Sequence, residues 1–328
     1  MSPGRVATWA AAVVVAAVGV GLAVPLLPGV FPVAQLVAFR AVLALAGVAG
    51  ALVLLAVPAV RRRTVPLAAA LALGAVAQAT VLVARTVPTA PPAAVAAAGT
   101  SGTTGDVVVL SFNTLDTVPA ATLADLALDV HADVLVLPET SRRTALATAA
   151  LLGAAGEPMQ VHEAAGSVPW ISGTSLLVSP EVGSYPDATD LPTRLGGVVA
   201  VPEDGTDPTI VAAHPLAPGR RSAMPAWRSE TAAVAARCAS TPGAIVAGDL
   251  NATLDHPGLQ DLGPCVDAAR AAGEAWRGTW PSSAPSVLAA PIDHVLVDGR
   301  AWRVTGFEVL GRTGGSDHRP VVAHLARR

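Results

Sequence analysis

The chain has 328 residues, a hydrophobic fraction of 52% and a mean hydropathy of +0.54, which together exclude a wholly soluble protein of ordinary composition. Residues 1–88 contain six arginines and no acid, whereas residues 89–328 contain 15 arginines and 24 acids, a net charge of −9. Two cysteines, Cys238 and Cys265, are too few for a disulfide scaffold and lack the spacing of a zinc site, but they leave open a single disulfide in an oxidising compartment.

Three apolar stretches begin the chain, at residues 6–25, 33–60 and 65–84. Each is close to or above the roughly 20 residues that cross a bilayer, and buried helices of soluble proteins are rarely so long and uncharged. The pattern predicts a three-helix transmembrane anchor over residues 1–85. Arg40 lies near the start of the second stretch, where we expect its long side chain to snorkel to the membrane interface.

The arginines of this region indicate its orientation. Arg61, Arg62 and Arg63 are predicted to lie in the short loop after the second span, which the positive-inside rule places in the cytoplasm. Arg5 agrees with this orientation and Arg85 opposes it. We therefore expect a multi-pass protein of the cell membrane, with a cytoplasmic N-terminus and an extracytoplasmic domain after the third span. A cleaved signal peptide is the alternative for the first span, but two further spans follow and no clear cleavage site precedes them.

Residues 86–105 contain Pro, Ala, Gly, Ser and Thr without periodicity, which predicts a flexible linker. From Asp106 onward, short apolar runs alternate with turns and helical segments, which predicts one α/β domain over residues 106–328. We expect helices at 119–131 and 222–239. The strands are expected at 107–112, 134–138, 174–179, 209–214, 244–249, 294–298 and 320–325.

Polar residues bound five of the apolar runs: Asn113, Glu139, His214, Asp249 with Asn251, and Asp293. Functional side chains cluster at strand ends, where a rigid sheet positions them. Phosphoester cleavage requires hard oxygen ligands for a Mg²⁺-like ion, a group that orients water, and donors to the phosphate. Glu139 is a candidate metal ligand, and Asp249 a candidate to orient or deprotonate water, with Asn251 donating to the phosphate. His318 is a candidate donor to the phosphoryl oxygens or the leaving group, and Asp293 is expected to orient its imidazole.

Five segments resemble, in order, the motifs of the endonuclease/exonuclease/phosphatase superfamily. They are SFNT (111–114), LPET (137–140), AGDLNAT (247–253), IDHVLV (292–297) and SDHRPV (316–321). This superfamily includes DNase I-like nucleases, abasic-site endonucleases, inositol-polyphosphate phosphatases and sphingomyelinases. The resemblance covers residues 106–325, and it implies a DNase I-like two-sheet α/β sandwich and a phosphoesterase that uses Mg²⁺ or Mn²⁺.

Carried over position by position, the resemblance implies that Asn113 and Glu139 lie at the metal, with Asp317 near or on it. The resemblance also implies the water and phosphate roles for Asp249 and Asn251, and a pairing of Asp293 with His318. His214 resembles a phosphate-contacting histidine of the family, although the usual H-L motif is here AHPL, and Pro215 would equally well end a strand.

Each of these residues alone has a structural alternative. Asp249 to Asn251 can form a turn, and Asp317 can cap a helix, but five motifs in order outweigh these explanations. His294 is a second-rank candidate for the site. The tract from Trp276 to Pro281 lines a substrate pocket, a lipid-facing rim or the core. The remaining histidines are expected to be structural or on the surface: His131, His162, His256 and His324.

We expect a membrane-anchored, extracytoplasmic phosphohydrolase that cleaves a lipid-linked or other cell-envelope phosphoester. The acidic, lysine-free domain disfavours nucleic acid, whose binding normally needs basic surface, and a membrane anchor raises the effective concentration of membrane-bound substrates. The layout of three spans and such a domain also resembles bacterial membrane proteins of the VanJ type, associated with glycopeptide resistance. The alternatives are an extracytoplasmic DNase I-like nuclease and a non-catalytic envelope protein that binds a phosphorylated ligand.

Overall fold

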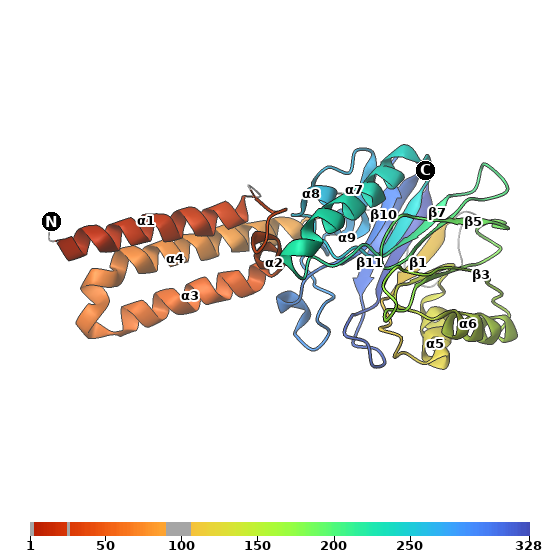
Figure 1. The fold of residues 1–328 in the computed structure, drawn as a ribbon, viewed down its shortest axis with the longest axis horizontal. Coiled ribbons are helices and arrows are strands. Elements are labelled where there is room, and N and C mark those ends of the chain that lie inside the picture. The colour runs from red at the N-terminus through yellow and green to blue at the C-terminus, as the bar shows by residue number, and fades with distance from the viewer. Residues whose placement is uncertain (1–2, 25–26, 90–105) are drawn as a thin grey trace.

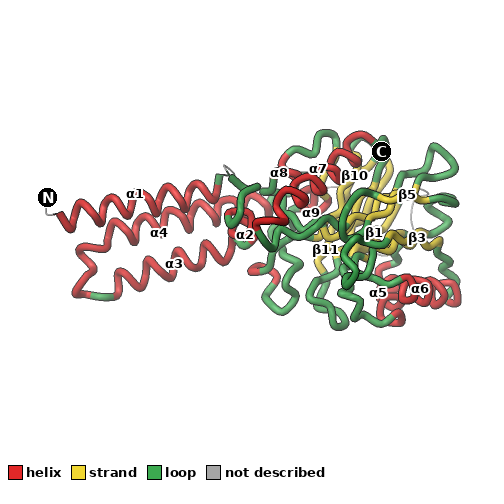
Figure 2. The backbone as a smooth tube through the Cα atoms, viewed as in Figure 1, coloured by secondary structure: helices red, strands yellow, loops and turns green. Residues whose placement is uncertain are grey.

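A computed structural model describes residues 3–24, 27–89 and 106–328, and it shows a rod of helices joined at one end to a two-sheet sandwich (Figure 1). In Figure 2, helix occupies nearly the whole rod, whereas strands and loops make up most of the sandwich. Residues 90–105, which form most of the predicted linker, lie outside the described residues.

The first and third predicted spans correspond to single helices, α1 (Pro3–Ala23) and α4 (Pro58–Arg85). The second contains two helices. Helix α2 (Val33–Ala38) ends before Phe39, whose φ of −113° and ψ of 52° lie outside the helical region, and α3 (Arg40–Ala56) begins after it. The expectation that Arg61–Arg63 lie in a loop is wrong. They lie in the first turns of α4, because the helix begins at Pro58, a residue suited to its first turn.

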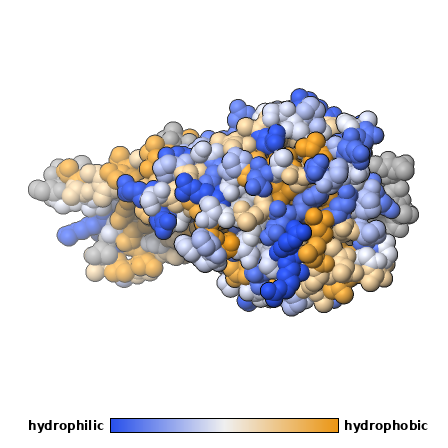
Figure 3. Space-filling model, turned by 45° about the vertical axis from the view of Figure 1, so that its right-hand side comes forward, coloured by the Kyte–Doolittle hydropathy of each residue, from blue (hydrophilic) through white to orange (hydrophobic). Residues whose placement is uncertain are grey.

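Two segments of the rod, Gly4–Ala23 and Arg61–Arg85, are helical, long and apolar enough to cross a membrane. The apolar helix Arg40–Ala56 is shorter, at 17 residues. The rod has much hydrophobic surface in Figure 3, where the sandwich has broad hydrophilic areas. Its helices approach closely through small residues, since a Cβ atom built on Gly19 of α1 would lie 2.9 Å from Gly74 Cα of α4.

The sandwich consists of two six-stranded sheets with the orders β11-β12-β1-β2-β4-β3 and β5-β6-β7-β8-β10-β9. The pairs β1–β2 and β7–β8 are parallel and the other pairs are antiparallel. The strands of the first sheet are β1 (Val107–Ser111), β2 (Val134–Leu137), β3 (Gln160–Ala164), β4 (Thr174–Val178), β11 (Trp302–Val309) and β12 (Val321–Arg327). Those of the second are β5 (Ala188–Asp190), β6 (Gly197–Ala200), β7 (Ile210–Ala213), β8 (Ile245–Asp249), β9 (Cys265–Asp267) and β10 (Asp293–Asp298).

Alternating side chains of each strand fill separate cores. In β1, Val107 and Val109 pack between the sheets in one cluster with Ile245 of β8, whereas Leu110 packs in another cluster with Leu123 of α5. Helices α5 (Ala120–Val130) and α6 (Arg142–Ala154) belong with the first sheet, and α7 (Met224–Ser240) and α8 (Pro257–Gln260) with the second. Helix α9 (Ala268–Ala272) packs in the cluster between the sheets, against β11 of the first and β10 of the second. The predicted two-sheet α/β sandwich is confirmed, and the ends of the predicted strands and helices differ by at most two residues.

Arg40 does not snorkel to the membrane interface as expected. Its side chain is buried, and its Nη2 atom lies 2.7 Å from Asp255 Oδ1 in the sandwich. The buried carboxylate of Asp255 compensates the guanidinium charge, so the Arg40 side chain turns into the protein and not toward the lipid headgroups. Arg85, which opposes the positive-inside rule, binds the same carboxylate, with Nη2 2.6 Å from Oδ2.

Cys238 of α7 and Cys265 of β9 form a disulfide across a sequence separation of 27. We expect Cys238→Ser to lower the free energy of unfolding of the domain by about 3 kcal/mol, because the disulfide restricts the unfolded chain over a loop of this length. Chemical denaturation measures the effect. Cys265→Ser and the double variant are the matched controls, and all three should unfold at the same denaturant concentration. A wild-type midpoint in the double variant would contradict a stabilising disulfide.

Candidate active site

The candidate site lies at one edge of the sandwich, where strand ends of both sheets meet. Asn113 and Glu139 each follow by two residues the parallel neighbours β1 and β2. His214 directly follows β7, and Asp249 ends its parallel neighbour β8. Asp293 begins β10, opposite Asp249 in an antiparallel pair. We refer to these five residues together with His318 as the site cluster.

Asn113 bridges two carboxylates that come from different sheets. Its Nδ2 donates to Glu139 Oε1 at 3.0 Å and to Asp249 Oδ2 at 3.1 Å. Its Oδ1 accepts from Leu115 N at 3.0 Å, which fixes the orientation of the amide. Since the Asn113 side chain is buried, these bonds lie in a low-dielectric environment and hold the two acids side by side.

Glu139 has a φ of 50°, in the left-handed region that glutamate rarely occupies. Its carbonyl accepts hydrogen bonds from Thr114 Oγ1 and from Asp116 N, both at 2.7 Å. Asn251, with a φ of 48°, shares the left-handed conformation. Strained backbone of this kind persists where the surrounding bonds determine it, and it clusters at functional sites.

His318 lies between two carboxylates, with Nδ1 2.9 Å from Asp293 Oδ2 and Nε2 3.6 Å from Asp249 Oδ2. Burial lowers the pKa of His318, but the charges of Asp293 and Asp249 outweigh burial and raise this pKa to about 10. Burial raises the pKa of Asp249, yet the charge of His318 and the hydrogen bond with His214 outweigh it and lower this pKa to about 2. At neutral pH, His318 is therefore a cationic donor and Asp249 an anionic acceptor.

His214 faces the same two acids as Asn113. Its Nε2 lies 3.4 Å from Asp249 Oδ2 and 3.9 Å from Glu139 Oε1. The ring is buried, and its Nδ1 has no hydrogen-bond partner among the described residues.

Asn251 and Asp317 lie beside the site cluster. Asn251 N donates to Asp249 Oδ1 at 2.9 Å, and its Nδ2 donates to Pro215 O at 3.0 Å, which leaves one amide hydrogen for a ligand. Asp317 Oδ2 accepts from Trp280 Nε1 at 2.9 Å, and in the described part of the chain no hydrogen bond joins this carboxylate to the site cluster. The metal role of Asp317 stays a prediction.

Glu139 and Asp249 fit a hard divalent cation. Their carboxylates offer the oxygen ligands that Mg²⁺ and Mn²⁺ prefer, and both accept from Asn113 Nδ2, whereas the Asn113 amide oxygen accepts from Leu115 N. Asp249, Asp293 and His318 also offer ligand atoms within 4.8 Å of one another. This second group fits a metal less well, because a His318 imidazolium donates at both nitrogens and has no lone pair for a metal.

Two supporting residues are not identified by sequence reasoning. Ser316 Oγ donates to Asn113 O at 2.6 Å and accepts from His318 N at 3.0 Å, so it connects the two ends of the site. Thr279 Oγ1 accepts from Asp293 N at 3.4 Å. Ser316 begins the SDHRPV motif, which could have identified it, whereas no sequence signal relates Thr279 to Asp293.

Trp280 and His294 each had alternative roles in the sequence. Trp280 of the tract Trp276–Pro281 lies at the site edge, since it binds Asp317 and its ring centroid lies 6.1 Å from that of Phe39 in the rod. His294, the second-rank candidate, lies outside the site cluster. Its Nδ1 is 2.7 Å from Asp267 Oδ2 in the interior, which indicates a structural role.

Comparison with known proteins gives one family match. The model of the Endonuclease/Exonuclease/phosphatase family matches residues 98–318, a segment that contains all residues of the site cluster. No protein with a curated description matches the chain.

Solved structures share this fold at low sequence identity. An endonuclease/exonuclease/phosphatase from Bacteroides vulgatus has a TM-score of 0.55 at 16% identity, over 68% of this chain and 99% of its own. One from Beutenbergia cavernae DSM 12333 has a TM-score of 0.54 at 17% identity, over 68% and 72%. D. rerio TDP2 complexed with single strand DNA product has a TM-score of 0.51 at 15% identity, over 67% and 98%. At these identities the likeness shows the fold alone.

Proposed function

Because the chain belongs to the endonuclease/exonuclease/phosphatase family, we propose that it is a membrane-anchored, Mg²⁺- or Mn²⁺-dependent phosphohydrolase. The position of Asp249 carries this proposal. Its Oδ2 atom lies 3.1 Å from Asn113 Nδ2, 3.4 Å from His214 Nε2 and 3.6 Å from His318 Nε2. An ionised acceptor among polar groups that can donate to phosphate is the arrangement that water-mediated phosphoester cleavage needs.

Glu139 would hold the metal ion, with Asn113 and Asp317 as the further residues predicted to lie at the metal. The bound ion would polarise a phosphoryl oxygen and neutralise part of the charge of the phosphate. Asp249 accepts a hydrogen bond from the attacking water and directs its oxygen toward phosphorus. No covalent intermediate with the enzyme forms, since water itself is the nucleophile.

Donors around Asp249 bind the phosphate. Asn251 contributes its free amide hydrogen, and His214 Nε2 donates to a phosphoryl oxygen. His318 donates from Nε2 to the developing negative charge or to the leaving oxygen, while Asp293 holds Nδ1 and maintains the ring orientation. These roles agree with the pKa directions, which make His318 a cation and Asp249 an anion.

We propose that the substrate is a lipid-linked or other envelope phosphoester. The site edge adjoins the rod, since Trp280 contacts both Asp317 and Phe39, the residue between α2 and α3. A phosphate at the membrane surface would therefore lie close to the site. The acidic, lysine-free composition of residues 89–328 supports such a substrate over a polyanionic nucleic acid.

We also propose a three-span anchor and an extracytoplasmic domain. The start of α1 and the junction of α3 with α4 lie at the end of the rod remote from the sandwich (Figure 1). Arg5 and Arg61–Arg63 belong to these helix starts, so the positive charge gathers at the remote end, which supports a cytoplasmic location for that end. The disulfide between Cys238 and Cys265 supports an oxidising compartment for the sandwich.

A nuclease is the second candidate function. It is favoured by the likeness in fold to D. rerio TDP2, whose structure was determined with a single strand DNA product. Nicking of a supercoiled plasmid by the full chain distinguishes the two functions. Hydrolysis of plasmid DNA faster than of a polyprenyl phosphate would favour the nuclease.

Removal of the metal tests the reaction class. We expect EDTA to lower phosphoester hydrolysis by the detergent-solubilised full chain by about 10³-fold, because a catalytic cation supplies several kcal/mol of charge stabilisation. Addition of excess Mg²⁺ or Mn²⁺ should restore the rate, whereas Ca²⁺ with its larger radius is the control. Phosphate release that is unchanged by chelation would contradict the proposal.

A further inference from the structure

The loop that follows Asp249 joins the site to the rod. Residues 250–256 connect β8 to α8, and we refer to them as the 250–256 loop. Near the start of this loop, Asn251 N donates to Asp249 Oδ1 at 2.9 Å. At its end, Asp255 and His256 are buried against helices of the rod. One short segment thus contacts both the site cluster and the rod.

Two arginines of the rod bind Asp255. Arg40 of α3 contacts both carboxylate oxygens, with Nη2 2.7 Å from Oδ1 and Nε 2.7 Å from Oδ2. Arg85 at the end of α4 donates from Nη2 to Oδ2 at 2.6 Å. Arg40 Nη1 also donates to Gln78 Oε1 at 2.6 Å, which links α3 to α4. The three charged side chains are at most 9% exposed, so loss of one partner leaves a buried charge with incomplete compensation.

His256 makes a further bond to the rod. Its Nδ1 accepts from Thr253 N at 2.7 Å, so Nε2 carries the proton and donates to Ala34 O of α2 at 2.9 Å. Burial lowers the pKa of His256 to about 4, which keeps the ring in this neutral form. The end of the 250–256 loop is therefore bound to α2, α3 and α4.

Internal bonds make the loop stiff between its two ends. Asp255 N donates to Thr253 Oγ1 at 3.3 Å, and Trp227 Nε1 donates to Asn251 O at 2.9 Å. Asn251 is also held in the left-handed conformation, with a φ of 48°. These bonds restrain the backbone between Asp255 and Asn251.

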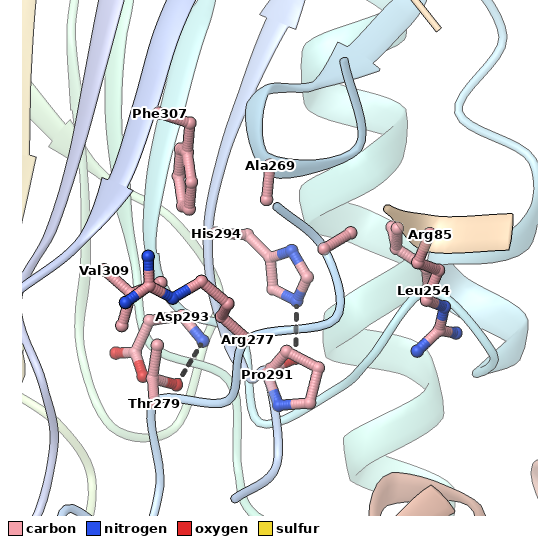
Figure 4. A pocket seen from close by; sticks show the side chains of 11 residues that line it. Arg85, Leu254, Ala269, Arg277, Thr279, Pro291, Asp293, His294, Phe307 and Val309 are labelled. Carbon is pink, nitrogen blue, oxygen red and sulfur yellow. Dashed lines mark hydrogen bonds between the residues drawn. The ribbon is translucent and has the colours of Figure 1, made fainter. Parts of the chain in front are cut away.

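The other side of the loop contacts the strand that carries Asp293. Ala252 O accepts from His294 Nε2 at 2.9 Å, and His294 directly follows Asp293. Arg85, Leu254, Asp293 and His294 line one small cavity (Figure 4). Arg85 at the end of α4 thus lines the same cavity as Asp293, whose carboxylate binds His318.

We propose that the rod is a structural part of the active site, in addition to a membrane anchor. Arg40 and Arg85 are positioning residues, which act through Asp255 to hold Asn251 beside Asp249 in the geometry that hydrolysis requires. This inference rests on the proposed function. Displacement of the helices would then lower turnover even though every residue of the site cluster is present.

The experiment uses the full chain in phosphatidylcholine nanodiscs, with bis(p-nitrophenyl) phosphate as a soluble probe that needs no membrane access. We expect Arg40→Gln and Arg85→Gln to lower kcat at least about tenfold with less than about a twofold change in KM, because the groups position the loop and do not bind the probe. Arg85→Lys, which keeps the charge, should recover most of the lost kcat. Arg228→Gln is the matched control. Arg228 Nη1 donates to Gly29 O at 2.7 Å at the same junction, and among the described residues no hydrogen bond joins its side chain to the 250–256 loop.

Hydrogen exchange of the same samples gives a readout that does not depend on activity. Peptides of the 250–256 loop should exchange faster in Arg85→Gln and unchanged in Arg228→Gln, while the strands β8 and β10 stay protected, which shows that the variant is folded. Wild-type kcat and wild-type exchange in both arginine variants would overturn the inference. If the wild-type chain cleaves no phosphoester, the proposed function fails. Unchanged exchange of the 250–256 loop in Arg85→Gln is by itself enough to overturn the coupling of rod and loop.

Discussion

Asp249→Asn is expected to lower kcat for phosphoester hydrolysis by about 10³-fold, within the range for loss of a group that orients or activates the nucleophile. The amide keeps the size of the side chain but removes the charge, so position 249 no longer accepts as an anion from Asn113 or forms ion pairs with His214 and His318. Steady-state kinetics at saturating Mg²⁺ measures the effect.

The control for this substitution is Glu308→Gln, which removes an acid from an exposed position of β11. It should leave kcat within about twofold of the wild-type value, as expected of a surface substitution remote from the chemistry. A rate for Asp249→Asn equal to that of Glu308→Gln would contradict the central role of Asp249.

Asp293→Asn is expected to lower kcat by about 10²-fold and to move the alkaline limb of the pH profile to lower pH. The carboxylates of Asp293 and Asp249 oppose the effect of burial and raise the pKa of His318 to about 10, so removal of one of them lowers this pKa. The wild-type limb should lie near pH 10. A limb at the same pH in both proteins would show that His318 is not the group that titrates.

The same shifts fix the sign of the pH dependence of stability. Because the folded-state pKa of His318 is raised to about 10, its contribution is fully present below the ordinary value of 6.5 and is lost as the pH rises through 10. The pKa of Asp249 is lowered to about 2, so its contribution is present above 3.8 and is lost as the pH falls toward 2. Both contributions are complete between pH 3.8 and pH 6.5, so the melting temperature should be constant there and should fall on either side.

The sandwich could be predicted from sequence because its inner strands are short apolar runs that end in polar residues. Elements in which apolar and polar residues are not separated in this way were not predicted. Strand β11 contains Gly306 and a register shift between Val304 and Gly306, which interrupt its alternation. Helix α6 (Arg142–Ala154) is rich in Ala and Thr and has a weak apolar face, although Ser141 caps it by accepting from Thr144 N.

The residues of the site cluster could be named from the sequence, since they stand at strand ends or in ordered motifs, and their catalytic and metal roles stay predictions. Ser316 and Thr279, which support them, were not named from a pattern of this kind. The contact between the rod and the sandwich was not predictable. Arg40 and Asp255 are 215 positions apart, and neither a period nor a motif relates them. A lone arginine in an apolar stretch suggests snorkelling, and only tertiary structure brings the acid that pairs with it.

One measurement tests the central claim most directly: release of phosphate from a polyprenyl phosphate by the full chain in nanodiscs with Mg²⁺. The wild-type protein should release phosphate, and both EDTA and Asp249→Asn should abolish the release without unfolding the protein. Equal release by the wild-type protein, the chelated protein and the variant, or none from any of them, would contradict a metal-dependent phosphohydrolase acting on membrane substrates at this site.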